Sequence, residues 1–129
     1  MADEPRPRLG AAGIGVTDLA RSTDFYMRHF GMRKAMEFTL PDMDEVVLGF
    51  RGGQTGLVLM AHRDRAGHDY AATGGKLVFY VEDPVAVAAS IRDDGGEIVR
   101  EPAPVPQLGD AVVGFAKDPD GHLIELLPA

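Results

Sequence analysis

The sequence predicts an α+β fold of two tandem βαβββ modules whose curved mixed sheets surround a cleft. Three observations support this prediction. The two halves of the 129-residue chain align without a gap when one is shifted by 65 positions. Strand-like and helix-like apolar patterns recur in the same order in both halves. Glycine and phenylalanine recur at this offset, in the pairs Gly31/Gly96, Gly49/Gly114, Phe50/Phe115 and Gly56/Gly121.

The first module is expected over residues 9–62. Its apolar run at 11–16 predicts a strand, and Thr17 or Asp18 offers an N-cap oxygen for the helix that follows. That helix places Leu19, Tyr26 and Phe30 on one face, and Gly31 ends it. Strands are then expected at 33–39, 45–50 and 56–62, with a hairpin turn at 51–54.

The second module is expected over residues 76–129. A strand at 76–81 precedes an N-cap at Asp83, a proline at the first helical position and a helix that Gly95 and Gly96 end. Strands are then expected at 97–101, 110–115 and 122–127, with a tight turn at 118–121. Residues 63–75 link the modules, and residues 1–8 are expected to form a disordered tail before a single domain over 9–129.

Composition excludes several classes of function. The net charge of −7 argues against nucleic acid and anionic membranes as partners. The absence of cysteine excludes disulfides, thiolate metal sites and cysteine nucleophiles. No apolar run is long enough to span a membrane and the N-terminus does not resemble a signal peptide, so a cytoplasmic location is expected.

Each module has one helix, which covers one face of its sheet. The other face must close on the sister module or on a second chain. A homodimer is therefore expected, with a concave cleft that binds a small molecule.

Three segments resemble the vicinal oxygen chelate superfamily, which includes glyoxalase I, bleomycin-resistance proteins and extradiol dioxygenases. They are residues 16–32, residues 91–96 and the Asp-Pro-Asp-Gly-His-Leu-Ile-Glu-Leu run at 118–126. The resemblance covers the chain from Leu9 to Leu127 and implies the paired-module fold. It is less specific for chemistry, because one fold hosts many functions.

The resemblance also implies four positions for a divalent metal ion. Residue by residue they are Ala11, Met60 (or Leu59 if the register slips by one), Lys76 and Glu125. Only Glu125 is a good ligand, since alanine offers no donor atom, a thioether favours soft ions and an ammonium repels a cation. The sequence therefore predicts no metal site and no cofactor.

Lys76 and Glu125 are expected to form an ion pair in the cleft, where Glu125 is a candidate general base. The alternative is a salt bridge without a chemical role. His62 shares a strand face with Met60 and is a second candidate acid or base, although a solvated histidine at a strand end is the simpler interpretation.

Other side chains are weaker candidates. Tyr80 shares strand parity with Lys76 and either lines the cleft or lies at the sheet edge. Phe50 and Phe115 are expected in the core, with a ligand wall as the alternative. With that alternative included, the candidate ligand-binding residues are Ala11, Phe50, Met60, Lys76, Tyr80, Phe115 and Glu125. His29 is expected on the helix surface, and no Ser-His-Asp arrangement is visible.

Two functions remain open at this stage. The first is a metal-free binding protein of the bleomycin-resistance type, which sequesters an apolar or cationic small molecule. The alternative is a glyoxalase-like lyase or isomerase that acts on a small carbonyl or thioester substrate, with Glu125 or His62 as acid or base. The sequence favours binding by a small margin because no nucleophile or oxyanion-stabilising group is visible.

Overall fold

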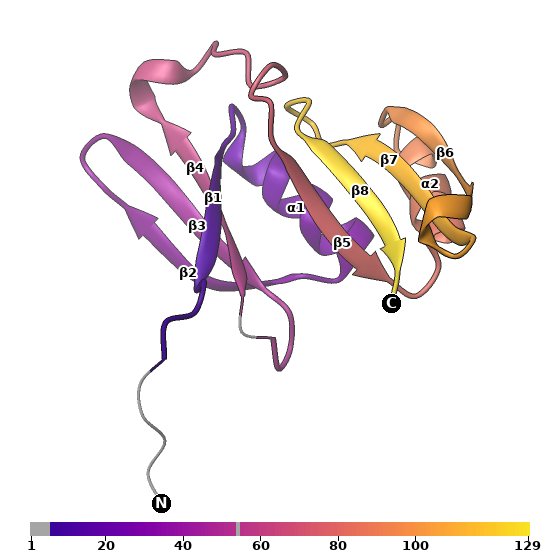
Figure 1. Ribbon diagram of the computed structural model, residues 1–129. Coiled ribbons are helices and arrows are strands. Elements are labelled where there is room, and N and C mark those ends of the chain that lie inside the picture. Colours follow the sequence, from indigo (N-terminus) through magenta and orange to yellow (C-terminus); the bar gives the residue numbers. More distant parts are fainter. Residues whose placement is uncertain (1–5, 54) are drawn as a thin grey trace, which may run out of the picture.

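The structure is a computed structural model that describes residues 6–53 and 55–129 (Figure 1). The first module comprises β1 (Ala11–Gly15), α1 (Leu19–Phe30), β2 (Arg33–Thr39), β3 (Met43–Gly49) and β4 (Gly56–His62). The second comprises β5 (Lys76–Val81), α2 (Pro84–Asp93), β6 (Ile98–Val105), β7 (Ala111–Lys117) and β8 (Leu123–Pro128). Two short 3₁₀ turns lie at Arg63–Arg65 and Pro106–Leu108.

The two sheets have the same topology, which confirms the predicted repeat. Their strand orders are β1-β4-β3-β2 and β5-β8-β7-β6, with the first pair of each sheet parallel and the others antiparallel. β1 and β5 are therefore the outer strands of their sheets, and they lie side by side at the junction of the modules (Figure 1).

Both helices begin at the predicted caps. The Asp18 carboxylate accepts from the backbone N–H of Arg21, and the Asp83 carboxylate accepts from Val85 and Ala86. Gly31 ends α1 in the left-handed conformation with φ 71°. The sequence therefore determined the helix limits through local hydrogen bonding.

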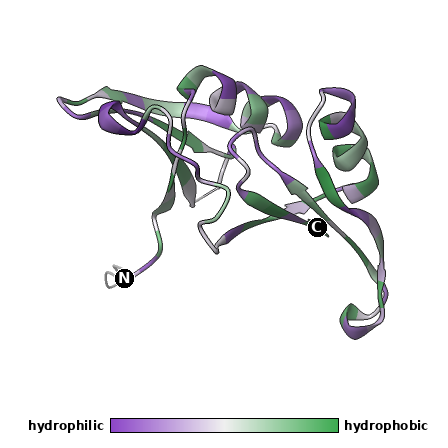
Figure 2. Cartoon of the chain, turned by 90° about the horizontal axis from the view of Figure 1, so that it is seen from above, coloured by the Kyte–Doolittle hydropathy of each residue, from purple (hydrophilic) through white to green (hydrophobic). Residues whose placement is uncertain are grey.

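One core serves both modules. Tyr26 of α1, Leu59 of β4, Ile91 of α2 and Ile124 of β8 are fully buried within it. The Phe30 ring of α1 stacks on Phe79 of β5 with the ring centroids 4.0 Å apart, so the first module's helix also packs against the second sheet. Seen from above, both helices lie on the same side of the sheets (Figure 2). The opposite sheet faces carry exposed large apolar side chains, among them Val78, Tyr80 and Phe38.

Several element limits differ from the prediction. The strand expected at 97–101 continues to Val105, because irregularities in its pairing with β7 accommodate Pro102 and Pro104 on an edge strand. β3 begins at Met43 rather than at residue 45, since Met43 pairs with His62. Of the predicted tail, residues 1–5 lie outside the described residues, as does Gln54 of the predicted turn.

No helix among the described residues is long and apolar enough to cross a membrane.

Candidate functional site

An ion pair between Lys76 and Glu125 forms the centre of the candidate site. Lys76 Nζ lies 2.6 Å from Glu125 Oε1, and the exposed fractions of the two side chains are 49% and 11%. Both residues lie on the sheet face away from the helices, because Leu77 and Ile124 beside them pack in the core. The expected ion pair is thus present, with a largely desolvated carboxylate and an ammonium open to solvent. An ammonium has three N–H donors, and Glu125 takes one of them.

Phe115 lies beneath this ion pair. It pairs with Glu125 in the β7–β8 register and so shares its face, and Lys76 Nζ lies 5.9 Å from the centre of its ring. At that distance the ring face attracts the cation. Phe115 is therefore part of the site rather than of the core, and it lies against both charged residues.

The structure of β4 shows which of Met60 and Leu59 lies on the sheet face away from the helices. Leu59 is fully buried in the core, whereas Met60 lies on the opposite face, where its Cε would be 3.1 Å from a Cβ on Gly13. Val58 is a further candidate for the first-module position that corresponds to Glu125. It pairs with Gly13 in the β1–β4 register, just as Glu125 pairs with Val78 in the β5–β8 register. Neither Met60 nor Val58 carries an oxygen or nitrogen donor.

His62 and Glu45 belong to the same face of the first module. Glu45 lies opposite Met60 in the β3–β4 register, and His62 lies opposite Met43. Both are half-buried, and neither contacts the Lys76–Glu125 pair in the part of the chain that the structure describes. Glu45 was not among the expected site residues, because its place opposite Met60 depends on the pairing of β3 with β4 and not on a local pattern.

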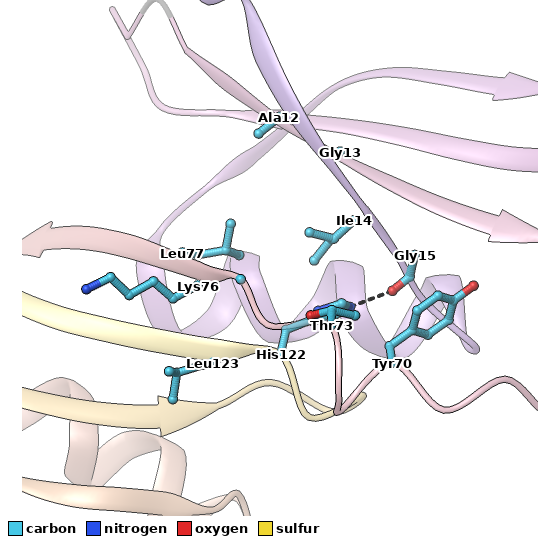
Figure 3. A pocket seen from close by; sticks show the side chains of 11 residues that line it. Ala12, Gly13, Ile14, Gly15, Tyr70, Thr73, Lys76, Leu77, His122 and Leu123 are labelled. Carbon is cyan, nitrogen blue, oxygen red and sulfur yellow. Dashed lines mark hydrogen bonds between the residues drawn. The ribbon is translucent and has the colours of Figure 1, made fainter.

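Two cavities lie where β1 and β5 meet. One of about 460 Å³ is lined by Phe50, Gly56, Val78 and Tyr80, so Phe50 and Tyr80 come together as exposed aromatic walls. The other, of about 410 Å³, is lined by Gly13, Tyr70, Lys76 and His122 (Figure 3). Ala11 is exposed and lines neither of these two cavities, whereas its neighbour Ala12 lines both.

Tyr70, in the segment between the modules, is a site residue that the sequence did not indicate. Its ring stacks on His122 at 5.6 Å between centroids, and His122 Nε2 lies 2.7 Å from the carbonyl oxygen of Gly15. The Tyr70 hydroxyl is buried without a hydrogen-bond partner among the described residues. Tyr70 thus anchors the intermodule segment, whose other residues at 63–75 are exposed, to the end of β1.

The Asp118–Gly121 turn ties the second module to α1. The Tyr26 hydroxyl donates to Asp118 Oδ2 over 2.6 Å, and Asp120 accepts from the Thr17 hydroxyl and backbone N–H. Burial raises the pKa of Asp118, and the hydrogen bond from Tyr26 opposes that rise. This turn, the most specific motif of the sequence, therefore serves the junction of the modules.

The expectation for His29 is wrong. Its side chain is 1% exposed, because α1 packs against α2 at this point. Nδ1 lies 2.7 Å from Ser90 Oγ, and Nε2 lies 3.1 Å from Asp94 Oδ2. A Ser-His-Asp arrangement does exist, and it joins α1, which carries His29, to Ser90 and Asp94 in and just after α2. Ser90 and Asp94 lie 61 and 65 residues from His29 in sequence, which is why the sequence pattern did not show the arrangement.

Residues 8–126 match the family profile of the Glyoxalase/Bleomycin resistance protein/Dioxygenase superfamily. The chain belongs to this superfamily. The resemblance expected from the sequence is thereby confirmed, and so is the glyoxalase-like α+β fold.

Its relatives within the superfamily include several enzymes. A probable lactoylglutathione lyase of Synechocystis sp. is 34% identical over 88% of this chain and 89% of its own length. The lactoylglutathione lyase of Haemophilus influenzae is 30% identical over 88% and 87%. The crystal structure of glyoxalase I from Zea mays superposes with a TM-score of 0.83 and 30% identity. The superposition covers 95% of this chain but only 44% of the maize chain.

The comparisons correct the leading functional hypothesis. Lactoylglutathione lyases at this similarity point to an enzyme, so the expectation of a protein that sequesters its ligand is wrong. An antibiotic binding protein, TnmS3 from Streptomyces sp., superposes with a TM-score of 0.75 but only 20% identity, and it shows the fold alone.

The expectation of no cofactor is also overturned, because the lactoylglutathione lyases that the chain matches are metal-dependent enzymes. The residues at the corresponding positions of this chain do not fit a divalent ion. Ala11 and Met60 offer no oxygen or nitrogen, the Lys76 ammonium lies against Glu125, and the described residues contain no group of three His, Cys, Asp or Glu side chains that could hold one.

Proposed function

We propose that the chain is a glyoxalase-type lyase that moves a proton between adjacent carbons of a thiol–carbonyl adduct. The observation that carries the proposal is the Glu125 carboxylate, which is 11% exposed and lies 2.6 Å from the ammonium of Lys76, a residue that lines the cavity of about 410 Å³. The similarity to lactoylglutathione lyases supports the same reaction class.

The name lactoylglutathione lyase specifies the substrate of these relatives and the type of reaction. Lactoylglutathione is the thioester of lactate with glutathione, and its cleavage by a lyase gives the free thiol and a 2-oxoaldehyde. In the forward direction the aldehyde and thiol first form a hemithioacetal. A base removes the proton from its carbon, and the electron pair moves onto the adjacent carbonyl oxygen to give an enediolate. The hydroxyl proton of the first carbon then passes to that second oxygen, and the base returns its proton to the second carbon. The product carries a thioester carbonyl on the first carbon and a hydroxyl on the second.

Glu125 is assigned as the base in this scheme. The remaining N–H donors of Lys76 are placed to stabilise negative charge that develops on the substrate oxygen. Phe115 lies against the ammonium and limits its positions. Phe50 and Tyr80 line the neighbouring cavity and would contact the apolar substituent of the aldehyde.

His62 is the alternative base, and a pair of variants distinguishes the two. Thioester formation from methylglyoxal and glutathione is measured for the wild type, Glu125→Gln and His62→Gln. Removal of a general base typically lowers the rate by about 10²–10⁴-fold. We expect that loss in Glu125→Gln, because this variant removes the base. We expect a change of less than about threefold in His62→Gln, because His62 is not the base in this scheme, and glutamine approximates the size of each replaced side chain. The reverse pattern would assign the base to His62.

A further inference from the structure

β1 and β5 each leave a row of backbone groups unpaired along their outer edge. The N–H of Val16 donates to Met60, and the carbonyl of Gly10 accepts from Gly56, so the even-numbered residues of β1 pair with β4. Because backbone groups alternate along a strand, Ala11, Gly13 and Gly15 direct theirs away from β4. In β5, the carbonyl of Val81 accepts from Ala129, which likewise leaves Lys76, Val78 and Tyr80 with outward groups.

These two edges face the junction between the modules. Gly13 and Val78 are exposed, and no strand pairing joins β1 to β5 among the described residues. The two cavities lie along this junction, and Ala12 and Leu77 line both of them. Figure 3 shows β1 and β5 diverging from the Gly15 end, with the cavity side chains between them. The free backbone groups thus lie beside space of the size that small ligands occupy.

The Gly15 end shows that the edge accepts hydrogen bonds from another part of the structure. His122 Nε2 approaches the outward carbonyl oxygen of Gly15 to 2.7 Å. The next outward groups, at Gly13 on β1 and Val78 on β5, have no hydrogen-bond partner in the described ranges 6–53 and 55–129. Unpaired strand edges are where extended peptides add to proteins.

We propose that these edges bind the peptide arm of a peptidyl-thiol substrate through main-chain hydrogen bonds to Val78 and Gly13. This inference rests on the proposed function, because it extends the same site. Val78 lies between Lys76 and Tyr80 on β5 and pairs with Glu125 in register, so an arm bound there brings a thiol adduct to the ion pair. An extended tripeptide spans about 10 Å, close to three strand residues.

The occupant fits a short peptide better than a strand of a second protein. β1 has five residues, and only Ala11 and Gly13 retain outward groups without a partner among the described residues. A ligand of three amide-linked units matches that length.

Calorimetric titration with S-methylglutathione, which cannot react, tests the proposal. Val78→Pro removes the outward N–H, which is not part of the β5–β8 ladder, and Val78→Ala is the matched control that keeps it. One net hydrogen bond corresponds to a weakening of about 3–10-fold. We expect this loss in Val78→Pro and less than about a twofold change in Val78→Ala. Circular dichroism and the melting temperature check that both variants fold.

A second arm leaves the protein unaltered. S-methylglutathione with its cysteinyl-glycine amide N-methylated loses a ligand donor, and we expect about 3–10-fold weaker binding to the wild type. Equal affinities for Val78→Pro and Val78→Ala, or for the two ligands, would overturn the proposal. So would a shift from dimer to monomer in Val78→Pro, since the edge would then be held by a second copy. If the affinities are equal but turnover still depends on Glu125, this inference fails and the proposed function stands. If binding depends on the strand edge but the protein shows no turnover, the proposed function alone is overturned.

Discussion

Tyr70 lies so close to Gly15 that no other residue fits at position 15 without movement. A Cβ built on Gly15 would lie 2.2 Å from Tyr70 Cε1. The glycine is therefore required by the close approach of a ring and not by its backbone conformation, since its φ is not positive. This contact holds the segment between the modules on the edge of the first sheet.

Gly15→Ala is expected to destabilise the protein by about 1–3 kcal/mol, the usual cost of overpacking. Tyr70→Ala in the same chain should remove the clash. The double variant should therefore lose less free energy of unfolding than the sum of the losses in the two single variants. Denaturant unfolding measures both. Gly10→Ala is the control, because a Cβ there meets nothing within 4 Å. A Gly15→Ala variant as stable as Gly10→Ala would show that the contact does not exist.

The Lys76–Glu125 pair should be energetically coupled. Lys76→Met leaves the carboxylate without its partner, which costs ~3–5 kcal/mol for a fully buried pair and less here because Lys76 is half exposed. Lys76→Met with Glu125→Gln should recover much of that loss, since no lone charge remains. Urea unfolding of the four proteins gives the coupling free energy, and strictly additive losses would contradict it.

His29 makes stability depend on pH. Burial lowers its pKa, although the nearby Asp94 opposes this. The native state therefore binds the proton more weakly than the unfolded chain, and the stabilisation is present above the unfolded pKa and lost as pH falls through the folded pKa. The free energy of unfolding should fall with pH in that window, and His29→Gln should flatten the dependence. Ser90→Ala, which keeps the titrating group, should retain it; a flat profile in the wild type would refute this role.

The open sheet faces predict a homodimer. Tyr80 is 71% exposed and Met36 52%, on faces that the helices do not cover. Large exposed apolar patches are unusual on soluble monomers. Sedimentation velocity should show a dimer at micromolar concentration, weakened by Phe38→Lys on the same face. A monomer with the wild-type sequence would contradict this expectation.

The sequence predicted the parts of the fold that depend on local signals. The Asp18 and Asp83 caps and the glycine after α1 determine both helices, and the 65-residue repeat determines the sheet topology. The limits of β6 were missed because they depend on how Pro102 and Pro104 pair with a neighbouring strand.

The site was predicted less completely. Strand parity placed Lys76 and Tyr80 on one face, because alternation is a property of the sequence alone, and the family resemblance placed Glu125 beside Lys76. The contacts of Tyr70 with Gly15, and of His29 with Ser90, join residues 55 and 61 positions apart, and no local pattern records them. The preference for ligand binding over catalysis failed for another reason: most of the family's ligand positions are replaced here, while the overall similarity is to enzymes.

Proton exchange at the substrate carbon tests the central claim most directly. Methylglyoxal and glutathione are incubated with the enzyme in D₂O, and deuterium at the carbon that carries the hydroxyl in the thioester product is measured by NMR. We expect the wild type to form the product and exchange the proton with solvent, and we expect both rates to be about 10²–10⁴-fold lower in Glu125→Gln, because the base is lost. Exchange that continues at the wild-type rate in Glu125→Gln would show that another group moves the proton.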